Sequence, residues 1–173
     1  LQRYRYAESS LIVHLLTPSN GKVHLIVKGA YRPRSAYYGV FDLFDTLLVR
    51  WRPPRHGELG VASAARVVVR RRALSEDLGR YRTALSALEL AAIAAQPGRE
   101  ETGLFRLTET WLELLLHTQL DSTLAQVAFD LRFLQDLGLS PSLETCAACG
   151  LSPERGEATE KSSAEALFSV GAG

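Results

Sequence analysis

The two cysteines of this sequence, Cys146 and Cys149, have the spacing of metal ligands. They form a Cys-x-x-Cys turn followed by Gly150, the pattern by which a zinc knuckle brings two thiolates to one metal. A closed structural zinc site needs four ligands, and neither a second cysteine pair nor a histidine at ligand spacing accompanies them. A redox dithiol would need a strand before the pair and a helix after it, and the sequence predicts neither. Three interpretations therefore stay open: half of a zinc site, an unliganded pair or a redox pair.

Aromatic residues are concentrated near the N-terminus, where eight of the fourteen precede residue 52. Residues 28–38 interleave tyrosines with lysine and arginine in a polar, proline-containing stretch, which predicts an exposed loop. Unpaired bases stack on aromatic faces while neighbouring cations follow the phosphates. The contacts predicted in this loop are Lys28, Arg32, Arg34 and Tyr37, although for Tyr31 and Tyr37 packing is an equally good interpretation. Phe41, Phe44 and Trp51 lie in or beside a predicted strand and are expected in the core.

Arginines gather at the ends of two predicted strands. One cluster surrounds the end of a strand expected at residues 45–52, and a run of three ends a strand expected at residues 57–72. Because alternate residues of a strand face opposite sides, Arg70 and Arg72 should share one face while Arg71 faces away. The nucleic-acid contacts predicted in these clusters are Arg50, Arg52, Arg55, Arg70 and Arg72.

The net charge of +1 conceals two oppositely charged regions. Residues 1–72 hold thirteen Lys and Arg against four Asp and Glu, whereas residues 73–173 hold seven against fifteen. The basic region indicates a polyanionic partner, since each phosphate that is neutralised releases counterions. The acidic region would repel a nucleic acid and so helps to decide which surface faces it. The alternative is that the arginines only solvate a small β-domain.

Signatures of catalysis are missing. The sequence has no Gly-rich phosphate loop, no Gly-x-Ser-x-Gly elbow and no His-Glu-x-x-His motif. Glu109 and Glu113 are four residues apart, the ordinary spacing of a solvated helix face. We therefore predict that the protein is not an enzyme. A composition of 46% hydrophobic and 23% charged residues is typical of a globular protein, and the absence of a long apolar run predicts no membrane association.

The first seventy residues are predicted to form about five short strands. Asn20-Gly21 predicts a type I′ turn that joins the second strand to the third. Five short strands without a helical period favour a small β-barrel, either an OB-fold or an SH3-like barrel. The expected strands span residues 3–7, 10–17, 23–28, 45–52 and 57–72.

The hydrophobic period becomes helical after Ser75. Ser75 and the two acids that follow it predict a helix start, and Pro97-Gly98 predicts the end of that helix. Two further helices are expected, one over about 102–118 and one over 122–137 with Ser122 as its cap. We predict that the three helices are antiparallel and pack beside the barrel.

Four stretches, spread in order over about 145 residues, carry a family resemblance. The first three are Tyr6-Ala-Glu-Ser-Ser10, Lys28-Gly-Ala30 and the arginine run with the residues after it, 70–78. The fourth and most specific runs from Leu137 to Gly150 and includes the cysteine pair. Together they resemble the RecO recombination mediators of bacteria, and the fourth is similar to the exit of that family's helical domain into a zinc-finger-like segment.

The resemblance implies an α+β, multi-domain protein. Its parts would be a five-stranded OB-fold β-barrel at residues 1–73, an incomplete all-α helical domain at 74–143 and a partial zinc-finger-like segment at 144–173. Family members bind and anneal single-stranded DNA, bind the tail of single-stranded DNA-binding protein, and load recombinase with RecR and often RecF. The resemblance thus implies DNA and protein partners, a zinc ion held in part by Cys146 and Cys149, and a bacterial, cytoplasmic, nucleoid-associated location.

The sequence departs from the family pattern in two places. The second cysteine pair is missing, and so are the C-terminal helices that help to form the surface for the single-stranded DNA-binding protein tail. With Leu1 at the start and no methionine, these departures predict a C-terminally truncated member. Two other functions stay open: an OB-type module that binds structured RNA, and a non-catalytic adaptor whose basic face meets an acidic protein.

Overall fold

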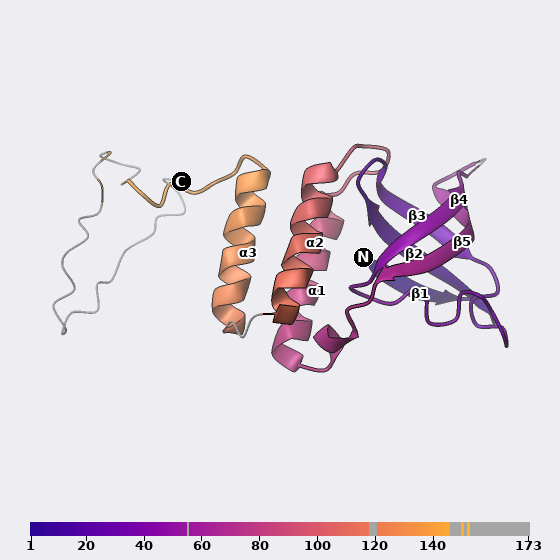
Figure 1. The fold of residues 1–173 in the computed structure, drawn as a ribbon. Coiled ribbons are helices and arrows are strands. Elements are labelled where there is room, and N and C mark those ends of the chain that lie inside the picture. Colours follow the sequence, from indigo (N-terminus) through magenta and orange to yellow (C-terminus); the bar gives the residue numbers. More distant parts are fainter. Residues whose placement is uncertain (55, 118–120, 146–149, 151, 153–173) are drawn as a thin grey trace.

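Five strands precede three helices along the chain. A computed structural model describes residues 1–54, 56–117, 121–145, 150 and 152. The strands form one sheet at the end of the molecule opposite to the third helix (Figure 1). The predicted α+β class, with strands first and helices after, is confirmed. The elements are β1 (Gln2–Tyr6), β2 (Ser10–Thr17), β3 (Gly21–Val27), β4 (Thr46–Arg52), β5 (Leu59–Val69), the 3-10 turn η1 (Arg72–Ser75), α1 (Leu78–Ala94), α2 (Thr102–His117) and α3 (Ser122–Asp136).

The sheet is mixed, with the strand order β1-β2-β3-β5-β4. All neighbours are antiparallel except β3 and β5. The edge strands are β1 and β4. Arg3 on β1 forms an ion pair of 2.9 Å with Asp42, which lies in the connection that leads into β4. A closed barrel would require a ladder between β1 and β4, and the sheet order of the described residues contains none. Barrel closure therefore stays a prediction.

The hairpin between β2 and β3 differs from its predicted turn type. Thr17 pairs with Gly21, so three residues form the loop, and Gly21 has a φ of +58° whereas Asn20 is not among the residues with positive φ. The predicted type I′ turn is therefore wrong. A three-residue loop followed by a left-handed glycine is the next most common hairpin connection, and it needs only one residue with positive φ.

The tip of this hairpin packs against the connection between α1 and α2. Lys22 N donates to Gln96 O at 3.2 Å, and Gly98 N donates to Asn20 O at 3.0 Å. A Cβ atom on Gly21 would lie 2.0 Å from Gln96 O, so only glycine fits at this position. The Lys22 Nζ atom adds a hydrogen bond of 2.7 Å to Ala92 O. The sheet and the helices are thus joined through backbone groups as well as side chains.

One face of the sheet is buried and forms the first core cluster. Leu25 and Val27 on β3 are fully buried and face Leu11 and Val13 on β2. Val13 pairs with Leu25 and Leu11 pairs with Val27, so these four side chains share one face of the sheet. Phe41 belongs to this cluster, and Tyr37 and Trp51 pack against it while partly exposed.

The helices enclose a second core cluster, centred on Trp111, Phe129 and Phe133. Phe44 from the segment before β4 and Leu74 from η1 are buried in the same cluster. The predicted burial of Phe41 and Phe44 is therefore confirmed, although the two rings enter different cores. No helix among the described residues is both long and apolar enough to cross a membrane.

The capping residues of two helices differ from those predicted. Asp77, not Ser75, caps α1, and its carboxylate accepts a hydrogen bond from Arg80 N. Asp121, not Ser122, caps α3 and accepts from the backbone of residues 123 and 124. In both cases the acidic residue has the non-helical backbone of a cap, and its carboxylate also offsets the positive end of the helix dipole.

Candidate nucleic-acid interface

The long connection between β3 and β4, residues 28–45, exposes three of the predicted contacts. Lys28, Arg32 and Arg34 are all exposed, and Arg34 has a left-handed backbone with φ +61°. Arg70 anchors the second half of this connection, because its Nη1 atom donates to Gly39 O at 3.1 Å. The exposed cations are therefore carried by a loop with fixed anchors.

Tyrosines of this loop differ in their exposure. Tyr37 is partly buried, with its ring 6.1 Å from that of Phe41, so packing accounts for much of its surface. Tyr31 is exposed and lies 5.5 Å below the guanidinium of Arg5. Tyr38, which the sequence did not single out, is the most exposed aromatic ring of the loop at 78%.

Arginines of β4 alternate with inward-facing residues. Arg50 and Arg52 are exposed, whereas Val49 and Trp51 pack against the sheet core. Both arginine side chains therefore point away from the sheet core and can reach a ligand in solution. Arg55 lies outside the described residues.

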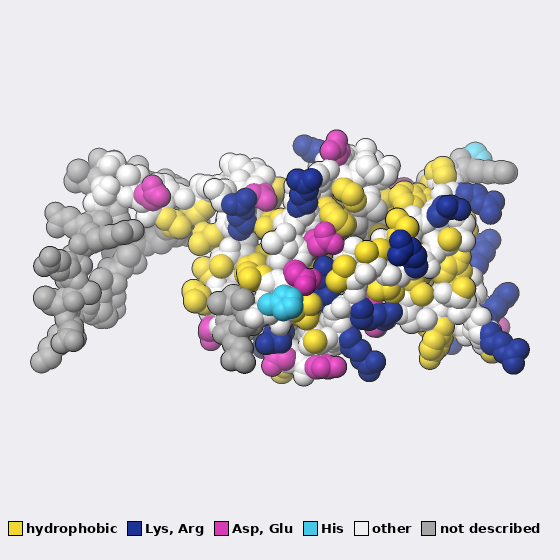
Figure 2. All heavy atoms as spheres, in the orientation of Figure 1, with side chains coloured by type: hydrophobic (Ala, Val, Ile, Leu, Met, Phe, Trp, Pro, Cys, Tyr) yellow, Lys and Arg dark blue, Asp and Glu magenta, His cyan; other side chains and the backbone are white. Residues whose placement is uncertain are grey.

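Basic and acidic side chains occupy different parts of the molecule. Figure 2 shows most Lys and Arg side chains over the strands at one end, and most Asp and Glu side chains over the helices. This distribution follows the split of thirteen cations against four acids in residues 1–72. A polyanion approaching the molecule is attracted to the sheet and repelled by the helices.

Three consecutive arginines, Arg70 to Arg72, have three different environments. β5 ends at Val69, so the predicted strand over residues 57–72 is too long. The prediction that Arg70 and Arg72 share one strand face therefore does not apply. Arg70 is partly exposed and lies 3.4 Å from the buried carboxylate of Asp45. Arg72 is exposed at the start of η1. Arg71 is buried, with only 2% of its surface exposed.

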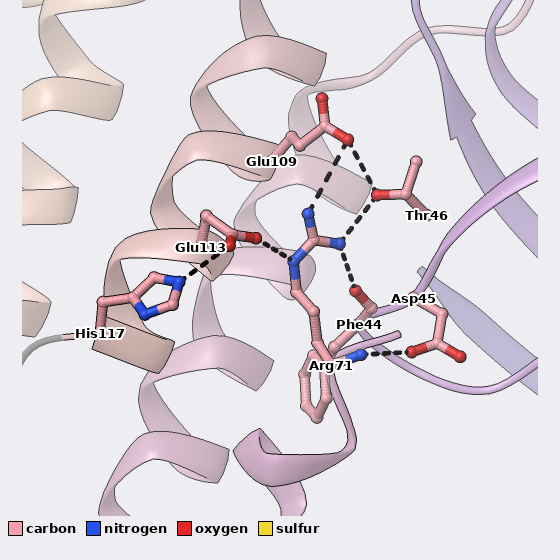
Figure 3. Close-up of polar contacts among 7 residues, drawn as sticks. All are labelled: Phe44, Asp45, Thr46, Arg71, Glu109, Glu113 and His117. Atoms are coloured by element: carbon pink, nitrogen blue, oxygen red, sulfur yellow. Dashed lines mark hydrogen bonds and ion pairs between the residues drawn. The ribbon is translucent and has the colours of Figure 1, made fainter. Parts of the chain in front are cut away.

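Arg71 connects the sheet to α2 (Figure 3). Its guanidinium donates to Phe44 O at 3.0 Å and to Thr46 Oγ1 at 2.8 Å. On the helix side, its Nε atom donates to Glu113 Oε2 at 3.2 Å, and its Nη2 atom lies 3.9 Å from Glu109 Oε1. The expectation that the two glutamates form only a solvated helix face is therefore wrong. Helical spacing places the two acids on one side of α2, but the sequence does not reveal the arginine opposite them.

The outer face of the sheet holds a row of side chains that the sequence prediction missed. Tyr4 pairs with Ile12, Ile12 with Ile26, and Ile26 with Val61. Val61 in turn pairs with Arg52 on β4. The signal was present in β2 and β3, where apolar residues occupy both alternating sets of positions rather than one.

Next to this row, His14 and His24 stack across β2 and β3 with ring centroids 4.1 Å apart. His14 also meets the ring edge of Tyr4, and its Nδ1 atom lies 3.1 Å from Gln2 Oε1. Burial holds the pKa of His14 below its usual value of 6.5, and the positive charges of His24, the N-terminus and Lys22 lower it further. A lowered pKa favours the neutral imidazole at pH 7, so His14 adds an aromatic ring but little charge to the outer face.

Metal binding at the cysteine pair is not tested by the structure, because Cys146 and Cys149 lie outside the described residues. Within the described part of the chain, no group of three His, Cys, Asp or Glu side chains is placed to hold a metal ion.

The fold and the charge distribution define a two-part α+β protein with a cationic sheet region and an acidic helical region. The family "Recombination protein O N terminal" matches residues 1–71, and "Recombination protein O C terminal" matches residues 75–170. The chain belongs to the RecO family.

Relatives in bacteria carry the description "DNA repair protein RecO". The protein of Anaeromyxobacter sp. (strain K) is 33% identical over 150 residues, which are 87% of this chain and 59% of the relative. That of Symbiobacterium thermophilum is 32% identical over 145 residues, 84% of this chain and 56% of the relative. The chain thus spans somewhat more than half the length of these relatives.

Proposed function

We propose that this chain binds single-stranded DNA through its sheet region, as the DNA-binding part of a RecO-type repair and recombination mediator. The observation that supports the proposal is the excess of cations in residues 1–72, most of them exposed, which lie over the strands in Figure 2 whereas most acidic side chains lie over the helices. Binding of this kind is driven by counterion release and is independent of sequence. It requires no nucleotide and no catalytic residue.

The proposed contacts differ in how freely they can reach a phosphate. Arg32, Arg34 and Arg52 are exposed, and no ion pair holds them among the described residues. Arg70 would have to leave Asp45 and Gly39. The full set proposed is Lys28, Arg32, Arg34, Tyr37, Arg50, Arg52, Arg55, Arg70 and Arg72.

Further properties come from the family and stay proposals for this chain. We propose that the protein anneals complementary strands, acts with RecR and possibly RecF to load recombinase, and binds the tail of single-stranded DNA-binding protein in the bacterial cytoplasm. The domain limits at residues 73 and 143 belong to the same proposal. Cys146 and Cys149 would supply two thiolate ligands to a zinc ion, and metal analysis of the purified chain tests this.

The DNA-binding proposal is tested by removing three exposed cations from the sheet region. Fluorescence anisotropy with an oligo(dT) strand over a salt series should show weaker binding for the variant R32A/R34A/R52A. The slope of log affinity against log salt should fall by about 2, since each contact with a single strand contributes roughly 0.7. A matched variant, R82A/R99A/R106A, removes the same charge from exposed positions of the helical region and should bind as the unaltered chain does.

Three outcomes would contradict the proposal. Tight binding to structured RNA with none to single-stranded DNA would favour a different OB-type module. Absence of oligonucleotide binding at moderate salt would favour an adaptor that meets an acidic protein. Equal losses in the two triple variants would place the DNA elsewhere than on the sheet region.

A further inference from the structure

The outer face of β1, β2 and β3 is unusually apolar for a sheet face turned to solvent. An antiparallel sheet with one buried face normally carries polar residues on the other. Here the buried face holds Val13 and Leu25, yet the opposite face presents Tyr4, Ile12 and Ile26 in direct cross-strand register. Ile12 and Ile26 are partly buried and Tyr4 is exposed, so part of this apolar row is open to a ligand.

Two tyrosines on β1 form the exposed part of this face. Tyr4 and Tyr6 lie on the same side of the strand and are 49% and 52% exposed. Alternate residues of a strand are roughly 7 Å apart, so each ring can take a separate planar partner. The Tyr4 ring is held in place, since its hydroxyl donates to Gln2 Oε1 at 2.7 Å and its edge meets His14. An aromatic ring that is already ordered loses less entropy when a ligand stacks on it.

Charge decides which class of ligand fits this face. Lys28 follows the end of β3, and Arg52 lies in the same cross-strand row as Ile26 and Val61. Arg32 follows in the loop after Lys28. An apolar and aromatic surface bordered by cations matches the pattern of a single strand, whose bases face the protein while its phosphates meet Lys and Arg.

We propose that Tyr4 and Tyr6, on the outer face of β1 to β3, are the surface on which bases of the single strand stack. This inference rests on the proposed DNA binding and moves the stacking site from the 28–38 loop to the sheet. Lys28 and Arg52 border the face and, with Arg32 in the adjoining loop, hold the phosphates. Tyr37 of the proposed contacts then mainly packs against the sheet core, with its ring 6.1 Å from that of Phe41.

The test compares ring removal with ring retention on β1. The variant Y4I/Y6I places β-branched, apolar side chains of high strand propensity on β1 and removes both rings, whereas Y4F/Y6F keeps both rings. Oligo(dT) anisotropy should show a loss of about fivefold or more per ring for Y4I/Y6I and little change for Y4F/Y6F. The salt slope should be unchanged in both, because no phosphate contact is removed.

The control variant Y38A removes the most exposed ring of the loop and should leave the affinity unchanged. Thermal unfolding of Y4I/Y6I, if it matches that of the unaltered chain, excludes loss of the strand as the cause. Unchanged affinity in Y4I/Y6I, or a loss in Y38A instead, would overturn the stacking site while leaving DNA binding intact. If the unaltered chain does not bind oligo(dT), both proposals fail.

Discussion

The sheet region and the helical region expose different chemistry on neighbouring surfaces. The sheet region presents arginines, tyrosines and the isoleucines of its outer face. The helical region presents acidic side chains. On α3 it also presents a stripe of exposed apolar residues, Leu124, Val127 and Leu131. On the proposed function, the charge of the first surface attracts a single strand of DNA and that of the second repels it. The two regions therefore cannot exchange roles, although both contribute to one molecule.

The junction between these regions combines the apolar packing of Phe44 and Leu74 with buried polar contacts. Arg71 is surrounded by acceptors from the sheet side and from α2, and the tip of the β2–β3 hairpin bonds to the α1–α2 connection. A buried ion pair adds little net stability, but removal of one partner leaves the others unpaired. The arrangement thus fixes the orientation of the basic surface relative to the acidic one.

Removal of the buried arginine should have the largest effect on this junction. The variant R71A leaves Phe44 O without its donor and removes the cation between Glu109 and Glu113. We expect a loss of about 3 kcal/mol or more in the free energy of unfolding, measured by urea denaturation.

The neighbouring residue offers a matched control for that variant. Arg72 is exposed, so R72A removes an arginine of the same run and should change stability by about 0.5 kcal/mol or less. Equal stability of the two variants would mean that the Arg71 contacts do not hold the regions together.

The sequence predicted the elements well and the junction poorly. The short strands expected in the first seventy residues and the helical period after Ser75 rest on local signals, and the structure contains the corresponding strands and helices. The partners of Arg71 are 25 to 42 residues away, and nothing local distinguishes that residue from Arg70 or Arg72. Tyr4 and Tyr6 were counted as aromatic residues, but the side chains beside them depend on the pairing of β1 with β2.

A substitution at the hairpin tip should have an intermediate effect. In G21A, the alanine would have to adopt the left-handed backbone of Gly21. Its methyl group would also lie 2.0 Å from Gln96 O, so the tip must withdraw from the α1–α2 connection. We expect a loss of about 2–3 kcal/mol by urea denaturation. Gly98 has a similar φ of +74° but open space around it, so G98A measures the backbone strain alone, about 1 kcal/mol. A G21A variant no less stable than G98A would show that close packing at the tip is unimportant.

The smallest effect is expected at the exposed end of the Arg71 network. His117 donates to Glu113 at 3.0 Å, and this bond, with the charge of Arg71, holds the pKa of the Glu113 carboxyl below its usual value of 4.5. A carboxyl with a lowered pKa stabilises the folded chain at pH values above 4.5, and that contribution disappears as the pH falls through the lowered pKa. The variant E113Q should therefore unfold at a lower temperature near pH 6, by no more than about 2 °C because solvent screens the pair.

That difference between E113Q and the unaltered chain should shrink steadily below pH 4.5 in thermal unfolding measured from pH 7 to pH 3. The H117A background removes the largest cause of the lowered pKa, so the effect of E113Q should be smaller there. A difference that stays constant down to pH 3 would show that the glutamine acts through packing rather than through loss of the charge. In that case the acidic partner of Arg71 would matter for its shape, and the electrostatic account of the junction would have to rest on the hydrogen bonds from Arg71 to Phe44 and Thr46 alone.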